Sequence, residues 1–105
     1  MLEVQITKDN FQKEVLDYKG TVILDFYGTW CMPCKMLAPI LDKVASDMPQ
    51  VKFGKVDVDQ AMDIARRFGI RSIPDVFIFK NGVQVDHMLG LRDEEEIAET
   101  ITKYL

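Results

Sequence analysis

The chain has 105 residues, of which 48% are hydrophobic and 29% charged, a composition typical of a globular protein and not of a disordered one. Its 13 basic and 17 acidic side chains give a net charge of −4 and a sequence pI near 4.9, which disfavours nucleic-acid binding. No apolar run approaches the roughly 20 residues that a membrane span needs, and the length predicts a single domain over residues 1–105.

The first residues, MLEVQITKDN, lack the basic and then hydrophobic segments of a signal peptide, so we expect a cytoplasmic protein or an already processed one. Alternation predicts a short strand at 4–6, and helical spacing predicts a helix over 11–18. The nearly unbroken apolar run 22–27 predicts a central strand that is covered on both faces. An amphipathic helix is predicted over 34–48, with a kink at Pro39.

The second half of the chain continues the alternation of strands and helices. A strand is predicted over 51–58, followed by a helix that Asp59 caps and that ends at Gly69. Two further strands at 76–79 and 83–85 enclose Asn81-Gly82, which is a strong signal for a tight hairpin.

The last predicted helix begins after Asp93, where Glu94-Glu95-Glu96 supply the acidic start that the helix dipole favours. The order of elements is therefore β-α-β-α-β-α-β-β-α. Strands separated by helices predict parallel crossovers, and the hairpin adds an antiparallel pair. The fold class is α/β, with a central mixed five-stranded sheet flanked by four helices.

The two cysteines, Cys31 and Cys34, lie three residues apart where the buried strand meets the following helix. At this spacing, on a first helical turn, their sulfurs can come within disulfide distance. The helix N-terminus stabilises a thiolate at Cys31, and the thiolate is the attacking species in disulfide exchange. Pro33 fits the first turn, where its missing N–H has no partner to lose. Cys34 lies a turn deeper, so we expect it to be more buried and less reactive.

Two other readings of the cysteine pair remain open at this point. The pair could be an inert structural bridge, although it closes too short a loop to stabilise the fold much. It could also be half of a zinc site, for which the chain offers only His87 as a further ligand of the usual kind. Met36, Met48 and Met62 are interpreted as packing residues and not as copper ligands.

Asp25 interrupts the apolar run of the central strand. Burial removes hydration from a carboxylate and raises its pKa, which makes it a usable proton acceptor near neutral pH. The alternative is a carboxyl group that is neutralised by a hydrogen bond and merely tolerated.

Short motifs along the whole chain accompany the cysteines: Asp25-Phe26, Trp30-Cys31-Met32-Pro33-Cys34-Lys35, Lys55-Val56-Asp57, Phe68-Gly69-Ile70, Ser72-Ile73-Pro74 and Phe79-Lys80-Asn81-Gly82. Together with the order of elements, these residues resemble the thioredoxin family over essentially the full length. The resemblance implies a thioredoxin fold and a general protein-disulfide oxidoreductase that reduces protein disulfides by dithiol–disulfide exchange.

The resemblance also implies roles for individual residues. Cys31 is then the nucleophile, Cys34 the resolving cysteine, Asp25 the carboxylate that takes the proton of Cys34, and Lys55 the neighbour of Asp25 beneath the site. Pro74 is then the cis-proline that faces the disulfide. The residues expected to bind substrate are Trp30, Met32, Pro33, Ile73, Pro74, Gly90 and Leu91. From the residues alone, Trp30 could instead serve packing, Lys55 could be solvated and Pro74 could be an ordinary trans turn residue.

The sequence departs from the family pattern at two positions. Met32 stands where most members have Gly, so we expect altered access to Cys31 and an altered balance between the two redox forms. Asp75 follows Pro74 where Thr is usual. Our hypothesis is that this carboxylate makes the Cys31 thiolate less favourable and disfavours acidic substrates.

The resemblance implies a separate thioredoxin reductase, NADPH- or ferredoxin-linked, and disulfide-containing client proteins as partners. We expect a monomer with no bound cofactor or metal, in which the Cys31–Cys34 disulfide is the redox group. The competing functions are an oxidant or isomerase like a protein disulfide isomerase domain, a glutaredoxin, and a binding subunit whose cysteines are incidental.

Overall fold

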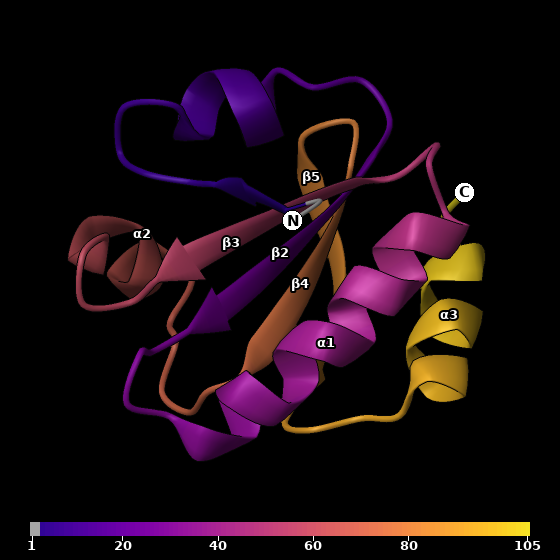
Figure 1. The fold of residues 1–105 in the computed structure, drawn as a ribbon. Helices are drawn as coiled ribbons and strands as arrows, with labels where there is room; N and C mark the ends of the chain where they lie inside the picture. The colour runs from indigo at the N-terminus through magenta and orange to yellow at the C-terminus, as the bar shows by residue number, and fades with distance from the viewer. Residues whose placement is uncertain (1–2) are drawn as a thin grey trace.

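The computed structural model describes residues 3–105. A five-stranded sheet with the spatial order β1-β3-β2-β4-β5 forms its centre (Figure 1). The strands are β1 (Glu3–Gln5), β2 (Thr21–Tyr27), β3 (Lys52–Asp57), β4 (Asp75–Lys80) and β5 (Val83–Leu89). β1, β3 and β2 run parallel, whereas β4 is antiparallel to β2 and β5 is antiparallel to β4. The mixed sheet predicted from the order of elements is therefore confirmed.

Three α-helices and one short π-helical turn cover the two faces of the sheet. They are η1 (Gln12–Leu16), α1 (Met32–Asp47), α2 (Met62–Arg67) and α3 (Glu94–Thr102). One apolar cluster joins α1 and α3 to the sheet, and a second joins η1 and α2 to the opposite face (Figure 1). This is the α/β thioredoxin arrangement that the sequence predicts.

The first predicted helix, over 11–18, is shorter than its apolar spacing indicates. It forms a single wide turn, closed by a 2.8 Å hydrogen bond from the Asp17 amide to the Gln12 carbonyl. Val15 is fully buried in this turn and anchors it against the sheet. The spacing therefore located the buried side correctly but not the type or length of the helix.

β2 is the central strand, and Thr21 to Phe26 are all buried. Its neighbours β3 and β4 pair along its whole length, so both edges of the strand are hydrogen-bonded. α1 starts at Met32, two residues before the predicted start, and continues without a break past Pro39 to Asp47. The segment that carries Cys31 and Cys34 thus lies between the most buried strand and the longest helix.

Two predicted details of the second half are wrong. Asp59 does not cap α2, because its carboxylate accepts a hydrogen bond from the Trp30 indole instead. β5 runs to Leu89 and not to Val85, because its antiparallel pairing with β4 continues until Leu89 lies opposite Asp75.

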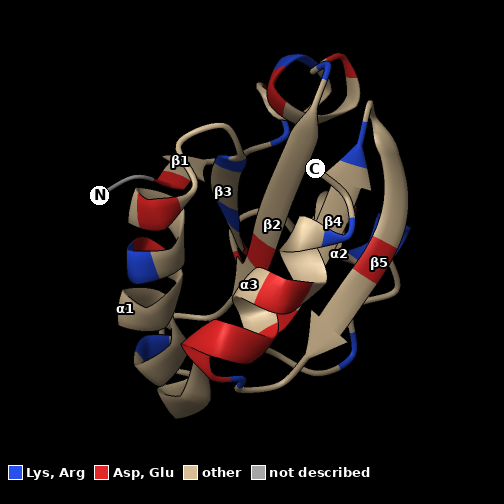
Figure 2. Ribbon diagram, turned by 90° about the vertical axis from the view of Figure 1, so that its right-hand side faces the viewer, with Lys and Arg blue, Asp and Glu red and all other residues tan. Residues whose placement is uncertain are grey.

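The hairpin and the last helix follow the prediction closely. Asn81 and Gly82 have φ values of 51° and 81°, the left-handed conformation that a two-residue hairpin turn requires. The Asp93 carboxylate accepts a 2.8 Å hydrogen bond from the Glu96 amide and caps α3, whose acidic first turn is red in Figure 2. Within residues 3–105, every helix is too short or too polar to span a lipid bilayer.

Candidate active site

The two cysteines lie at the N-terminus of α1 and are joined by a disulfide, with their Cα atoms 5.3 Å apart. Cys31 is the N-cap residue, and its Sγ accepts a 3.2 Å hydrogen bond from the Cys34 amide. Pro33 occupies the first turn, as the sequence predicts. Negative charge on Cys31 would therefore meet free amide groups and the positive end of the α1 dipole.

Burial does not distinguish the two cysteines, contrary to the expectation that Cys34 is the more buried. Cys31 is 5% exposed and Cys34 is 4% exposed. Their surroundings differ instead. Cys31 lies between the exposed residues Trp30 and Met32, whereas Cys34 lines a cavity beneath the disulfide.

The loop before β4 passes directly over Cys31. The Ile73–Pro74 peptide bond is cis, and the Ile73 carbonyl oxygen lies 3.8 Å from Cys31 Sγ. On the other side, the Gly90 amide donates a 2.8 Å hydrogen bond to the Pro74 carbonyl. The fold therefore brings together three parts of the chain that are far apart in the sequence: Cys31, the Ile73–Pro74 pair and Gly90.

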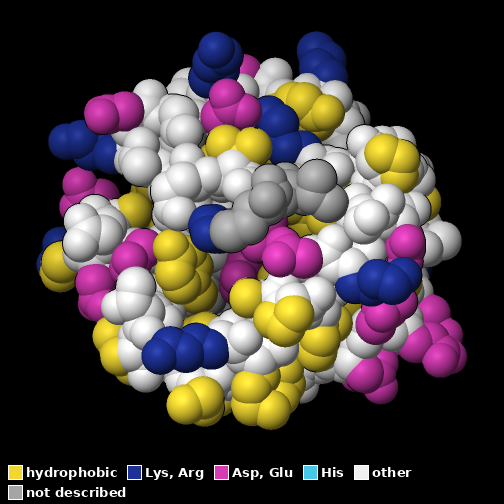
Figure 3. Space-filling view, in the orientation of Figure 1, with side chains coloured by type: hydrophobic (Ala, Val, Ile, Leu, Met, Phe, Trp, Pro, Cys, Tyr) yellow, Lys and Arg dark blue, Asp and Glu magenta, His cyan; other side chains and the backbone are white. Residues whose placement is uncertain are grey.

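Apolar side chains are exposed around the disulfide. Trp30 is 66% exposed, Met32 63% and Leu91 43%. Yellow side chains gather along the lower edge of the face shown in Figure 3, at the end of the molecule where α1 begins in Figure 1. An exposed apolar surface around a reactive group is typical of a protein-binding site.

Trp30 is exposed but held in position. Its Nε1 donates a 2.7 Å hydrogen bond to the Asp59 carboxylate. A Cβ added to Gly28 would come within 2.9 Å of the indole and 3.0 Å of the Ile73 side chain, so this glycine lets both approach the loop closely. The indole is thus oriented for contacts and not free to rotate.

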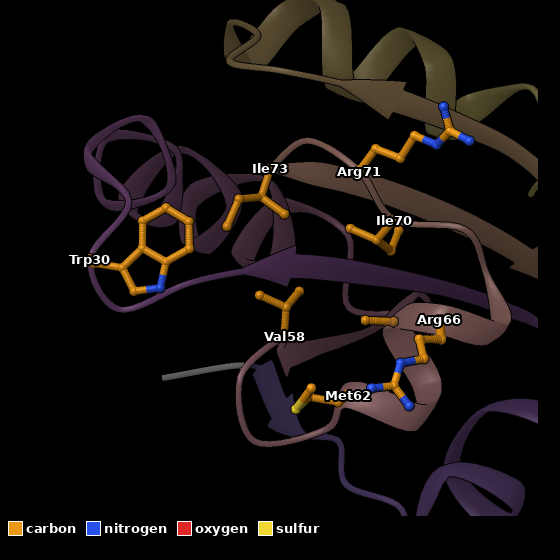
Figure 4. A pocket seen from close by; sticks show the side chains of 8 residues that line it. Trp30, Val58, Met62, Arg66, Ile70, Arg71 and Ile73 are labelled. Atoms are coloured by element: carbon orange, nitrogen blue, oxygen red, sulfur yellow. The ribbon is translucent and has the colours of Figure 1, made fainter.

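A groove of about 270 Å³ runs beside Trp30 (Figure 4). Val58 and Ile73 lie on the two sides of its apolar floor near the indole, and Arg66 and Arg71 lie at the end away from Trp30. The sequence analysis missed both arginines and Val58, because no local pattern shows that α2 and the loop before β4 face the same groove. For Arg71, its position two residues before Ile73 was the signal that could have placed it near the substrate-binding loop.

The three methionines interpreted as packing residues do not share one environment. Met48 packs against the α1 and α3 cluster, as expected. Met36 and Met62 are 53% and 52% exposed, and Met62 lines the groove. For these two the packing interpretation is wrong, because helical spacing alone does not show which side of a helix is covered.

Beneath the disulfide, a cavity of about 290 Å³ connects Cys34 with Asp25 and Lys55. Asp25 is 4% exposed and lies within the central strand β2. Its Oδ1 has no hydrogen-bond partner among residues 3–105. Burial, and next the charge of Glu3, raise the pKa of Asp25 to about 8, while Lys55 opposes the rise. This carboxyl group therefore exchanges its proton near neutral pH.

The same cavity contains two acidic residues that the sequence analysis did not single out. Glu3 and Asp42 line it together with Asp25, and each has a buried oxygen without a partner among the described residues. Burial, and next the charge of Asp42, raise the pKa of Glu3 to about 7. Asp42 follows Cys34 by eight residues on α1, and this helical spacing was the signal that could have revealed it.

Asp75 points away from this cavity, on the sheet face that carries Phe77. Its carboxylate lies 3.0 Å from Nδ1 of His87 on the neighbouring strand. No local sequence pattern at Asp75 or His87 predicts this pair, because only the pairing of β4 with β5 brings the two side chains together. Among residues 3–105, no group of three or more His, Cys, Asp or Glu side chains could hold a metal ion.

Comparisons with known proteins agree with this geometry. The sequence profile of the thioredoxin family matches residues 3–103. Thioredoxin 1 of Synechococcus elongatus is 41% identical over 101 residues, which cover 95% of this chain and 94% of that protein. Thioredoxins of Rickettsia felis and Chlamydia muridarum are 40% and 37% identical over 99 residues each, covering 93% and 94% of this chain and 94% and 95% of those proteins. The chain therefore belongs to the thioredoxin family and is a protein-disulfide oxidoreductase whose redox-active centre is the Cys31–Cys34 pair.

Proposed function

We propose that the chain acts as a single domain and a general disulfide reductase, with Cys31 as nucleophile and Cys34 as resolving cysteine. The observation that carries this assignment is the position of Cys31 at the N-cap of α1. There its sulfur already accepts a hydrogen bond from the Cys34 backbone amide. A thiolate at this position gains the same amide as a donor and the favourable end of the helix dipole.

In the first step, the Cys31 thiolate attacks one sulfur of a client disulfide. A mixed disulfide forms between Cys31 and the client, and the other client sulfur leaves as a thiolate. The exposed side chains of Trp30, Met32 and Leu91, together with Pro33 and Gly90, form the docking surface for the client. The backbone of Ile73 beside Pro74 pairs with an extended client segment, as an added strand pairs with a sheet edge.

In the second step, Cys34 loses its proton to Asp25 and attacks Cys31 Sγ. The Cys31–Cys34 disulfide forms and the second client thiolate leaves, so the client gains the two electrons that the protein loses. A pKa of about 8 suits Asp25 to this exchange, because the group can both take and release a proton near neutral pH. Lys55, on the strand next to Asp25, moderates that pKa.

The proposed partners are disulfide-containing client proteins and a separate thioredoxin reductase, NADPH- or ferredoxin-linked, that returns two electrons to the disulfide. We propose that the protein acts in the cytoplasm, as a monomer, without a bound cofactor. The redox group is then the cysteine pair itself.

Turnover of a disulfide-bonded test protein with a dithiol as electron donor tests the assignment. Cys31→Ser abolishes turnover. Cys34→Ser stops after one attack and accumulates a covalent client adduct on Cys31, visible by mass spectrometry and released by dithiol. A Cys31→Ser protein that keeps the full rate, or a Cys34→Ser protein that forms no adduct, overturns the assignment.

A further inference from the structure

Glu3 belongs to the group of residues that surrounds the buried proton acceptor, although it lies on the short first strand and far from the cysteines in sequence. β1 pairs with β3, and β3 pairs with β2, so that Glu3 lies opposite Phe53 and Phe53 opposite Ile23. Side chains alternate along strands, so Glu3, Ile23 and Asp25 share one sheet face. That face is the one covered by α1, because Ile23 and Phe53 pack against this helix.

α1 supplies the opposite wall of the same cavity. Cys34, Ala38 and Asp42 follow each other at intervals of four residues, so they form one stripe along the helix. All three line the cavity with Asp25 and Glu3. The cavity therefore extends along α1 from the resolving cysteine past Asp25 to two further carboxyl groups.

The carboxyl groups are arranged from the inside of the cavity to its mouth. Asp25 is buried, whereas Glu3 and Asp42 are only partly buried. One oxygen of each group is buried and has no hydrogen-bond partner within residues 3–105. The cavity of about 290 Å³ is large enough to hold several waters, and these three carboxyl oxygens are the acceptors that such waters need.

We propose that Glu3 is a positioning residue for the resolving step: it shares a proton with Asp25 across this cavity and passes the Cys34 proton on towards solvent. The inference rests on the proposed role of Asp25. In balance, the Cys34 thiol gives H⁺ to the Asp25–Glu3 pair, the pair gives one H⁺ to water at the mouth, and the Cys34 thiolate forms the new S–S bond. No electron passes through the carboxyl groups.

The electrostatic interaction between the two acids supports the proposal. The pKa of Glu3 is raised to about 7 and that of Asp25 to about 8, and the negative charge of Glu3 is one cause of the rise at Asp25. Because such an interaction acts on both partners, the two carboxyl groups titrate as a coupled pair near neutral pH. The other charged or titratable groups lining the cavity are Tyr27, Lys35, Asp42 and Lys55. Lys55 lowers the pKa of both acids.

The experiment compares Glu3→Gln with Glu99→Gln, which removes the same charge from an exposed position of α3. The pH at which Asp25 is half ionised is followed by carboxyl ¹³C NMR. The rate of the resolving step is measured from the decay of a preformed mixed disulfide between Cys31 and a small thiol.

In Glu3→Gln, both the NMR midpoint and the midpoint of the rate profile shift to lower pH by about half a unit or more. In Glu99→Gln and in the conservative Glu3→Asp, both stay near the wild-type values.

A double-mutant cycle separates this inference from the proposed function. In an Asp25→Asn background, Glu3→Gln produces no further shift of the rate profile. If Glu3→Gln leaves both midpoints unchanged while the mixed disulfide still forms and resolves, the role of Glu3 is overturned and that of the cysteines stands. If no mixed disulfide forms on Cys31 at all, it is the proposed function that fails.

Discussion

The chemistry of the site depends on what surrounds each group and not on which residue types are present. Asp25 and Asp75 are both buried aspartates on neighbouring strands, yet their side chains lie on opposite faces of the sheet. Asp25 faces a cavity and has an oxygen without a partner among residues 3–105, so burial raises its pKa to about 8. Asp75 is paired with His87 on the opposite face of the sheet.

The raised pKa of Asp25 predicts that the protein loses stability as the pH increases. The folded state holds the proton up to about pH 8, whereas the unfolded chain releases it near pH 3.8. The stabilisation is therefore fully present below about pH 4 and is lost as the pH rises through the folded pKa.

Relative to wild type, oxidised Asp25→Asn should gain on the order of a few kcal/mol in unfolding free energy across this window. Urea denaturation from pH 4 to 9 measures it, with Asp9→Asn as the exposed control. A constant difference between Asp25→Asn and wild type would contradict the raised pKa.

The Asp75–His87 pair gives a second prediction at this scale. His87→Ala leaves a buried carboxylate without its 3.0 Å partner, and a lost partner of this kind costs about 1–3 kcal/mol. In an Asp75→Thr background the same change should cost clearly less. Thermal or urea unfolding of the four proteins measures the coupling, and equal costs in both backgrounds would show that the pair does not contribute to stability.

At the scale of secondary-structure elements, local patterns predicted most of the fold. The apolar run of β2, the turn at Asn81-Gly82 and the cap at Asp93 each have a local physical cause, and each is present in the structure. The errors concern contacts between elements. Asp59 binds Trp30 instead of capping α2, and β5 follows its partner strand four residues further than alternation indicated.

The glycines of two turns allow a matched test of packing against backbone strain. Gly82 has φ of 81°, and a Cβ there would collide with the carbonyl of Leu16. Gly69 has φ of 64° and open space around its Cβ position. Gly69→Ala should therefore lower the free energy of unfolding by about 1–2 kcal/mol, because alanine is strained in the left-handed conformation. Gly82→Ala should lower it by more, because the collision with Leu16 adds to the same strain. Denaturant unfolding ranks the two, and equal losses would contradict the contact between the hairpin and Leu16.

At the scale of the whole molecule, the position of the site follows from the topology. The C-terminal end of β2, the start of α1 and the loop before β4 meet at one end of the sheet, which places Cys31 beside Ile73. The cysteines, Asp25, Trp30 and Pro74 were predictable because each has a strong local or family signal. Glu3, Val58 and Arg66 were not, because only tertiary packing brings them to the cavity and the groove.

The distribution of charge predicts a preference among clients. The protein carries a net charge of −4, yet Arg66 and Arg71 line the groove beside Trp30. A client with an acidic segment next to its disulfide should therefore bind to this groove more tightly than a client with a basic segment. This is the opposite of the preference that the Asp75 carboxylate suggested from the sequence. Arg66→Gln/Arg71→Gln should lower kcat/KM for acidic peptide disulfides several-fold at low salt, and high salt should remove the difference. Lys13→Gln/Lys103→Gln removes the same charge elsewhere and should have little effect. Equal effects of the two double variants would argue against the groove.

The central claim is that the start of α1 stabilises Cys31 as a thiolate, while Cys34 lines the cavity and is less reactive. Alkylation of the fully reduced protein at pH 7, with each modified cysteine identified by mass spectrometry, tests this most directly. The account predicts that Cys31 reacts much faster than a free cysteine and that Cys34 remains largely unmodified in the same interval. Equally slow alkylation of both cysteines would contradict it.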